Sequence, residues 1–372
     1  MKLTIERAAL LKSLAHVQSV VERRNTIPIL ANLLLEAGDG RLSLTATDMD
    51  LTIVEEVTAE VGLGGATTVP AHTLYDIVRK LPEGAQVALA VGGEGQQMTL
   101  SAGRSTFTLQ TLPKEDFPSM GAGELPQVFT LQAGELKNLI DRTRFAISTE
   151  ETRYYLNGIY LHAAKAGKLP VLRAVATDGH RLARFEMPLP DGAAEMPSVI
   201  VPRKTVGEVH RLVEGSDQPV EVALSDAKIR FAFDSIVVTS KLIDGTFPDY
   251  ERVIPSGNDK EVQVHCKTFA EAVDRVSTIS SEKSRAVKLA LADGTVTLSA
   301  TSPENGTAVE EVEVTYGGPA IEIGFNARYL LDIAQQIGGE TAGFAMADAA
   351  SPTLIRDLDD ASALYVLMPM RV

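Results

Sequence analysis

The stretch RLSLTATDMDLTI at residues 41–53 contains a short motif, ATD, that returns at regular distances along the chain. A second copy stands at 176–178 within VLRAVATDGHRLARF, and a changed copy, ATS, stands at 300–302 within TVTLSATSPENG. The spacing of the copies is close to one third of the 372-residue chain. Self-similarity at a fixed period indicates copies of one structural unit.

The segments around the three copies share a common pattern. Residues 2–21, 128–147 and 261–280 each open with strand-like alternation and continue with apolar residues at helical spacing. Residues 67–81, 198–213 and 321–337 each show a short β-rich run, a Pro or Gly, and an amphipathic helix of about three turns. Each copy therefore predicts two strand–helix–strands units, and the chain predicts six.

Two polar segments rich in Gly and Pro, 121–127 and 254–260, are typical of linkers between domains. They predict three domains: 1–127, 128–258 and 259–372. Short alternating runs between the helices, such as VALAV at 87–91, indicate hairpin-connected strands. The predicted fold class is α+β, with three tandem similar domains that each back antiparallel strands with two helices. The ATD motif is expected to end the second strand of each domain, where Asp48 or Asp178 caps a turn.

Composition limits the environment in which the protein works. Apolar residues make up 45 % of the chain and charged residues 23 %, as in soluble globular proteins. No apolar run reaches the roughly 18 residues of a membrane span, and Lys2, Glu6 and Arg7 interrupt the N-terminal region where a signal peptide would be apolar. The single cysteine, Cys266, excludes an intrachain disulfide and a multi-cysteine metal site. We expect a cytoplasmic protein with no cofactor and no metal.

The charge pattern allows two interpretations. The net charge is −14, yet nearly half of the 35 Lys and Arg residues fall in 128–258, many of them on or beside predicted helices. The helices could present a basic surface to DNA, or they could carry ordinary mixed charge. Six helices packed side by side around a ring would leave a hole of only about 6 Å, and twelve would leave about 23 Å. A DNA duplex is about 20 Å across, so a ring around DNA would require two chains.

The sequence contains no GxxxxGK[ST] loop, no GxGxxG after a strand, and no HExxH. Only TDGHRL at 177–182 offers reactive groups, since Asp178 and His180 could form a general acid–base pair or supply two metal ligands. A soluble hydrolase centred on Asp178 and His180 is therefore an alternative function. No catalytic residue is predicted otherwise.

Several longer blocks, in order along the whole chain, carry a resemblance to a known family. They include MKLTIER at 1–7, IPILANLLLEA at 27–37, TLPKEDFP at 111–118, ATDGHRLA at 176–183, SKLIDGTFPDY at 240–250 and YVLMPMRV at 365–372. The chain closely resembles the β subunit of bacterial DNA polymerase III, the sliding clamp. The resemblance implies a head-to-tail homodimeric ring, with helices inside and sheets outside, that slides on duplex DNA without reading its sequence. It also implies that the protein is not an enzyme. The implied partners are the catalytic subunit of the replicative polymerase, the clamp loader and other replication and repair proteins that carry short clamp-binding peptides.

The resemblance also assigns residues to DNA contact and to ring closure. The DNA-binding set is Arg24, His72, Glu150, Arg153, Tyr154 and Tyr155. His72 stands where the family has an Arg, and Glu150 stands where it has a neutral Gln. The dimer interface is assigned to Phe107 and Leu109 against Thr278 and Ile279, with Thr278 in place of a larger apolar residue.

A pocket for partner peptides is the third set of residues that the resemblance implies. It comprises Leu156, Thr177, Gly179, His180, Arg181, Leu182, Pro248, Arg252, Val253, Pro352, Val366, Met368, Pro369, Met370 and Arg371. Pro352 stands where the family has a small polar residue. On this view the middle ATD copy has been extended into ATDGHRL to line the pocket. Flexible Met beside Pro suits a surface that accepts many peptides, although YVLMPM taken alone is typical of a buried final strand.

Overall fold

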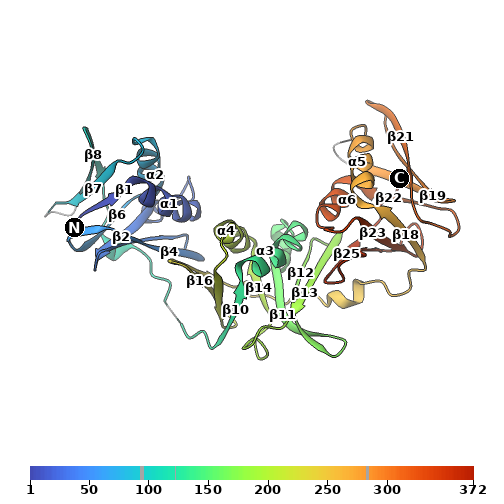
Figure 1. The fold of residues 1–372 in the computed structure, drawn as a ribbon, viewed down its shortest axis with the longest axis horizontal. Coiled ribbons are helices and arrows are strands. Elements are labelled where there is room, and N and C mark those ends of the chain that lie inside the picture. Colours follow the sequence, from blue (N-terminus) through green and yellow to red (C-terminus); the bar gives the residue numbers. More distant parts are fainter. Residues whose placement is uncertain (93–95, 122, 282–284) are drawn as a thin grey trace. The chain divides into compact units, whose positions relative to one another are not determined.

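The structure is a computed structural model that describes residues 1–92, 96–121, 123–281 and 285–372 (Figure 1). Residue 122, in the first predicted linker, lies outside the described residues. The described chain forms two compact units. Unit 1 contains Met1–Leu136, Asp191–Met196 and Gly207–Leu242, and unit 2 contains Lys137–Pro190, Pro197–Val206 and Ile243–Val372. The predicted central domain, 128–258, is thus divided between the two units.

The helices agree with the six predicted from the repeats. They are α1 (Arg7–Val17), α2 (Ala71–Lys80), α3 (Ala133–Asp141), α4 (Arg203–Val213), α5 (Cys266–Ser277) and α6 (Ala327–Ala334). Helix α1 begins where the Glu6 carboxylate accepts a hydrogen bond from the Ala9 amide at 2.9 Å. It buries Leu10, Leu14 and Val17, as their spacing predicts.

Unit 1 contains two antiparallel sheets. The five-stranded sheet has the order β5 (Glu60–Leu63), β1 (Lys2–Glu6), β7 (Gln86–Val91), β8 (Gln97–Ala102) and β9 (Ser105–Gln110). The eight-stranded sheet has the order β10 (Gln127–Gln132), β15 (Pro219–Leu224), β16 (Lys228–Phe233), β17 (Ile236–Lys241), β4 (Leu51–Thr58), β3 (Arg41–Thr47), β2 (Asn32–Gly38) and β6 (Gly65–Pro70).

Unit 2 repeats this plan with an eight-stranded and a four-stranded sheet. The larger sheet has the order β14 (Val199–Pro202), β11 (Gly158–Ala166), β12 (Leu169–Thr177), β13 (Arg181–Pro188), β25 (Ala363–Leu367), β24 (Thr353–Asp357), β23 (Thr341–Met346) and β18 (Lys260–His265). The smaller sheet has the order β21 (Gly306–Glu313), β20 (Thr295–Ser302), β19 (Ala286–Ala292) and β22 (Ile321–Asn326).

Each eight-stranded sheet runs across a predicted domain boundary. In unit 1, β4 of the first domain pairs with β17 of the second, with Ile53 opposite Val238. In unit 2, β13 of the second domain pairs with β25 of the third, with Ala183 opposite Tyr365. We call these two antiparallel pairs the seams. Backbone hydrogen bonding therefore continues through each boundary rather than ending at it.

The repeated motif ends the third strand of each domain, so the prediction that it ends the second strand was wrong. The stretch at 32–38 forms a separate strand, β2, before the ATD motif, and β11 and β19 occupy the same place in the other domains. The predicted turn cap is confirmed. The Asp48 carboxylate accepts from the Asp50 and Leu51 amides at 2.9 and 2.7 Å, and Asp178 accepts from the amides of the two corresponding residues.

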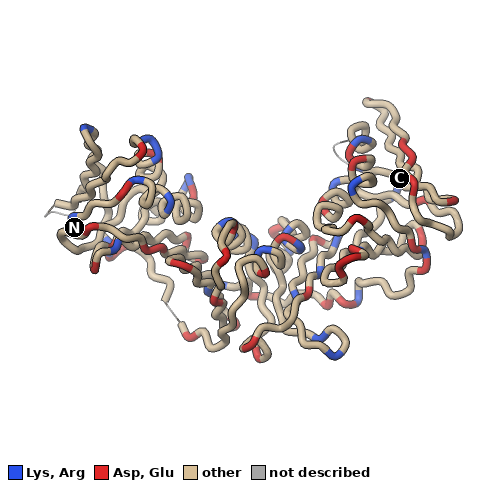
Figure 2. The backbone as a smooth tube through the Cα atoms, in the orientation of Figure 1, with Lys and Arg blue, Asp and Glu red and all other residues tan. Residues whose placement is uncertain are grey.

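The helices carry charges of both signs, as Figure 2 shows. Lys137 pairs with Asp141 within α3, and Arg211 pairs with Glu208 within α4. Glu55, one of the acids in a strand, is buried and pairs with His16 of α1 at 2.8 Å. The mixed-charge interpretation therefore describes these helices better than a purely basic surface. Within the described ranges, no helix is long and apolar enough to cross a membrane.

Candidate binding site

A cavity of about 250 Å³ lies in unit 2 on the seam between β13 and β25. Leu182 of β13 lies directly opposite Val366 of β25, and both side chains line the cavity. The remaining lining residues come mainly from the 3-10 helices η5 (Glu151–Leu156) and η6 (Tyr250–Val253) and from the turn after β12. Four of the lining residues, Leu156, Leu182, Val366 and Tyr250, belong to one buried apolar cluster. The site is thus an apolar depression on a rigid sheet.

The turn TDGHRL forms one rim of the cavity through its backbone conformation. Gly179 has a φ of +87°, which a glycine adopts without strain. Met49 occupies the same place in the first ATD turn and also has a positive φ, of 78°. The two turns have the same length between their flanking strands, so the expected extension of the middle copy was wrong. The turns differ in side chains and not in length.

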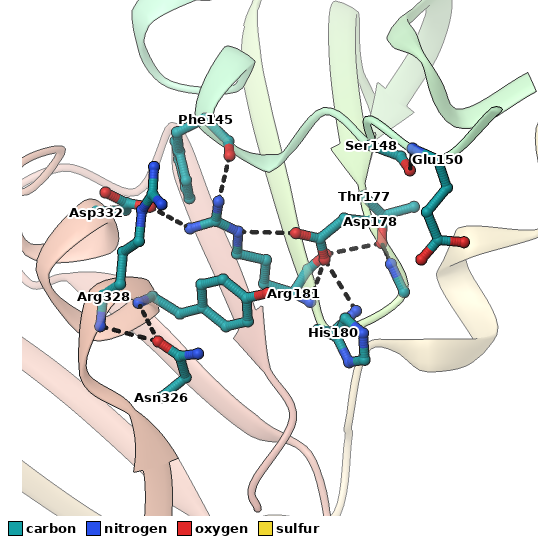
Figure 3. A network of polar contacts seen from close by, with 12 residues as sticks. Phe145, Ser148, Glu150, Thr177, Asp178, His180, Arg181, Asn326, Arg328 and Asp332 are labelled. Atoms are coloured by element: carbon teal, nitrogen blue, oxygen red, sulfur yellow. Dashed lines mark hydrogen bonds and ion pairs between the residues drawn. The ribbon is translucent and has the colours of Figure 1, made fainter. Parts of the chain in front are cut away.

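Arg181 fixes this turn to two other elements of unit 2 (Figure 3). Its guanidinium donates to the Asp178 carboxylate at 3.1 Å, to Asp332 of α6 at 2.5 Å and to the Phe145 carbonyl at 2.6 Å. It also lies against the rings of Phe145 and Tyr329, at 5.1 and 4.2 Å from their centroids. Because only 9 % of its side chain is exposed, these contacts hold Arg181 as a structural anchor.

The same contacts leave the hydrolase alternative without support. The Asp178 carboxylate is occupied by two backbone amides and by Arg181. The His180 ring stacks on Tyr329, with 6.3 Å between the ring centroids. Asp178 and His180 are therefore used for turn formation and packing rather than as a general acid–base pair.

A network of polar contacts around the buried Arg173 holds η6, the opposite wall, in place. Arg173 of β12 donates to the Tyr250 hydroxyl at 2.7 Å and to the Glu251 carboxylate at 2.6 Å. It also pairs with Glu186 at 2.7 Å. Burial raises the pKa of the Tyr250 phenol further above neutral pH, so this hydroxyl stays protonated also in alkaline solution. The wall is therefore fixed before any ligand arrives.

Nine of the fifteen predicted pocket residues line the cavity: Leu156, Thr177, Gly179, Arg181, Leu182, Pro248, Val253, Val366 and Met368. The other six are His180, Arg252, Pro352, Pro369, Met370 and Arg371. The Met370 amide donates to the Gly324 carbonyl of β22 at 2.8 Å, and Met370 and Arg371 line a separate groove with Val372. Arg252 is exposed and pairs with Asp249, and the Pro352 carbonyl accepts from Asn258.

Four further residues line the cavity that the sequence did not assign to it. Arg153 and Tyr155 were assigned to DNA contact, and Asp249 and Tyr250 were not assigned at all. For Asp249 and Tyr250 the only indication in the sequence was their position in the block FPDY at 247–250, next to Pro248, which was assigned to the pocket.

The other residues assigned to DNA contact differ in exposure. Arg24 is exposed, and Tyr154 is 53 % exposed with its ring against Tyr155. The His72 Nε2 donates to the Val21 carbonyl at 2.8 Å, so this imidazole is held by the backbone. Glu150 pairs with Arg153.

The residues assigned to the dimer interface lie on different units. In unit 1, Phe107 is 36 % exposed on the edge strand β9, while Leu109 is buried. In unit 2, Thr278 is exposed and Ile279 half-buried directly after α5.

Comparison with known proteins finds matches along the whole chain. Residues 1–121, 130–249 and 251–371 match the models of the N-terminal, central and C-terminal domains of the DNA polymerase III beta subunit. The beta sliding clamp of Caulobacter vibrioides strain NA1000 is 58 % identical and that of Escherichia coli strain K12 is 42 % identical, each over all of both chains. A sliding clamp from Bartonella birtlesii, solved with griselimycin bound, superposes with a TM-score of 0.97 at 51 % identity and covers all of both chains.

The anchoring role of Arg181 predicts the result of a conservative substitution. Arg181→Lys keeps the charge but cannot reach Asp178, Asp332 and the Phe145 carbonyl together, so we expect a loss of about 2 kcal/mol of unfolding free energy. Arg252→Lys is the control, because Arg252 is 83 % exposed and forms one ion pair, and we expect a loss below about 0.5 kcal/mol. Denaturant unfolding measures both variants, and equal losses would contradict the anchor.

Proposed function

The chain belongs to the family of DNA polymerase III beta subunits, the beta sliding clamps, and from this premise we propose how its own residues carry the function. It is a non-catalytic processivity subunit that encircles duplex DNA and tethers the replicative polymerase and other replication proteins. We place its domains at 1–127, 128–258 and 259–372, and we place its work in the cytoplasm. The observation that supports this proposal is that the seam occurs twice along three similar domains. Two seams use the last strands of the second and third domains, so the last strand of the first domain and the strand after the repeated motif in the third domain remain at sheet edges.

The two free strands correspond to the strands that form the seams. Ala46, Ala176 and Ala300 of the repeated motif lie opposite Ile53, Ala183 and Ala308, so β21 corresponds to β4 and β13. Val238, Tyr365 and Phe107 lie in the last strand of each domain, opposite Phe231, Ile355 and Leu100. Strand β9 therefore corresponds to β17 and β25. Among the described residues β9 pairs only with β8 and β21 only with β20.

The seams then give the register of the ring-closing contact. Ile53 faces Val238 and Ala183 faces Tyr365, so Phe107 of one protomer should face Ala308 of the other. The same register places Thr108 opposite Thr307 and Arg104 opposite Glu311, which adds an ion pair of opposite charges. It also covers two exposed apolar side chains, Phe107 and Val309. Each copy offers one β9 and one β21, as a closed head-to-tail ring requires.

The DNA-facing role rests on the exposed Arg24 and Tyr154 and on the cations of the helices. Arg contacts phosphate without reading sequence, and Tyr can contact a base or the backbone. Because many helix cations are already paired with acids, direct attraction to DNA should be weak. Retention on DNA then depends on the closed ring.

The cavity on the β13–β25 seam takes the clamp-binding peptides of partner proteins. Its lining is mostly apolar, with the exposed Val253 and Met368 at its mouth. Val253 is 51 % exposed and Met368 is 40 % exposed. Apolar anchors of a short peptide would bury these side chains, and such anchors dominate small interfaces.

The register predicts a specific cross-link. Thr108→Cys combined with Thr307→Cys should form an intermolecular disulfide on oxidation, because directly opposite residues meet the distances that a disulfide needs. Non-reducing gel electrophoresis should show a covalent dimer. Thr106→Cys with Thr307→Cys is displaced by two residues and should stay unlinked. Equal linking of the two pairs, or a dimer in solution that links neither pair, would show that the register is wrong.

Encirclement predicts retention that depends on DNA topology. Protein loaded onto a nicked circular plasmid by its clamp loader should remain bound through gel filtration and should dissociate once a restriction enzyme makes one double-strand cut. Short linear duplex should bind weakly and lose affinity with salt, since few phosphates are contacted. Equal retention on circular and linear DNA would falsify the sliding ring.

The peptide pocket predicts different effects for two C-terminal deletions. Removing Met368–Val372 leaves β25 intact but takes Met368 from the cavity, so affinity for an apolar clamp-binding peptide should fall about thirty-fold. Both deletions remove the hydrogen bond from the Met370 amide to the Gly324 carbonyl. Removing only Met370–Val372 keeps Met368, and peptide affinity should stay within about threefold of the intact protein. Peptide titration and thermal unfolding on both proteins test this, and a similar loss from both deletions would contradict the role of Met368.

A further inference from the structure

The rim of the cavity contains an ion pair between Glu150 and Arg153. The Arg153 Nε donates to one Glu150 carboxylate oxygen at 2.8 Å, and its Nη2 donates to the other at 2.6 Å. This is the two-point arrangement in which an arginine binds a carboxylate most strongly. Arg153 is one of the residues that line the cavity, and Glu150 is not. The arginine therefore meets the cavity with a carboxylate already bound.

The local backbone holds this pair in position. Arg153 departs from helical geometry within η5, with φ −110° and ψ 51°, and this kink sits at the residue that lines the cavity. The Glu150 amide donates to the Ser148 hydroxyl oxygen at 3.1 Å, and the Arg153 Nη2 also donates to the Asp178 carbonyl at 3.3 Å. A Cβ at Gly179 would stand 2.6 Å from the Arg153 Nη1, so the glycine leaves room for the guanidinium.

The charge balance around Arg153 is close to neutral. Glu150 neutralises Arg153, and on the opposite wall Asp249 pairs with Arg252 at 2.7 Å. Arg181 is occupied by Asp178 and Asp332. The hydrogen bond from Arg153 lowers the pKa of the Glu150 carboxyl, so Glu150 stays ionised at neutral pH. A ligand thus meets an arginine whose charge is already compensated.

We propose that Glu150 is an internal competitor for Arg153, and that it makes the cavity select against partner segments that present a carboxylate to this arginine. A peptide carboxylate must displace Glu150 to reach the guanidinium, and it is repelled by Glu150 while it approaches. A neutral peptide side chain meets neither obstacle. Glu150 is therefore a specificity-determining residue of the pocket, and this inference rests on the proposed peptide-binding function.

The variant Glu150→Gln removes the proposed competition for Arg153. In Glu150→Gln the side chain has nearly the same size, but Arg153 loses its charged partner. The arginine can then pair with a peptide carboxylate without displacing one. Glu151→Gln is the matched control, because it removes the same charge from the next residue, which is exposed and is not the partner of Arg153.

The experiment compares acidic and neutral peptides on the full-length dimer. The probe is an apolar clamp-binding peptide without acids, together with a series in which one Glu, or one Gln as its counterpart, is stepped through the non-anchor positions. For at least one position, the ratio of Glu-peptide to Gln-peptide affinity should rise about threefold to fivefold in Glu150→Gln, as expected for an exposed ion pair. In Glu151→Gln the ratio should change by less than about 1.5-fold, since that charge is not paired with Arg153. The double variant Glu150→Gln, Arg153→Gln should lose the gain.

Three results would overturn the inference. The ratio could stay unchanged in Glu150→Gln, or it could change equally in Glu150→Gln and Glu151→Gln, which would indicate a general field effect. Glu150→Gln could instead alter only retention on DNA, which would assign the pair to phosphate contact. Failure of the unaltered protein to bind the acid-free peptide refutes the pocket itself, and that result is distinct from normal binding with an unchanged ratio.

Discussion

Antiparallel pairing at the seams is the constraint on which the rest of the structure depends. The last strands of the second and third domains, β17 and β25, each pair with the strand after the repeated motif in the preceding domain. Because side chains alternate across a strand, the register of each seam decides which residues face the helices and which face outward. Ile53 and Val238 face inward in one seam, and Ala183 and Tyr365 take the same places in the other. Both the cavity and the proposed ring-closing contact follow from this register.

The same register explains why the cavity on the β13–β25 seam is apolar. The first pair of outward positions is Leu182 with Val366 in the β13–β25 seam and Thr52 with Thr239 in the β4–β17 seam. The equivalent pair at the proposed ring-closing contact is Thr307 with Thr108. Only the first pair is apolar, and only there do η5 and η6 supply Leu156 and Tyr250 to the same cluster. The binding site thus lies where an apolar pair of outward positions and two 3-10 helices meet on a repeated scaffold.

The repeats made most of the fold predictable, and the site less so. Periodicity is a local property, so the six helices and the turn capped by Asp48 and Asp178 were readable from the sequence. The separate strand at 32–38 could not be predicted in this way, because the repeated pattern lies in the helices and in the ATD motif. The role of Arg153 could not be predicted either. Its position depends on a kink within η5 and on Gly179, which is distant in sequence and close in space. The network of Arg173 and Tyr250 is likewise a product of tertiary packing.

The two edge strands β9 and β21 have a consequence for mixtures of subunits. In the proposed ring each protomer takes part in two junctions, once through β9 and once through β21. A subunit with a damaged β21 but a normal β9 can still dock on an unaltered subunit, and the resulting pair has one sound junction and one broken junction. Such a heterodimer is an open arc that keeps its peptide pockets. It would occupy partner proteins without enclosing DNA, so damage to one edge strand should act dominantly over the unaltered copy.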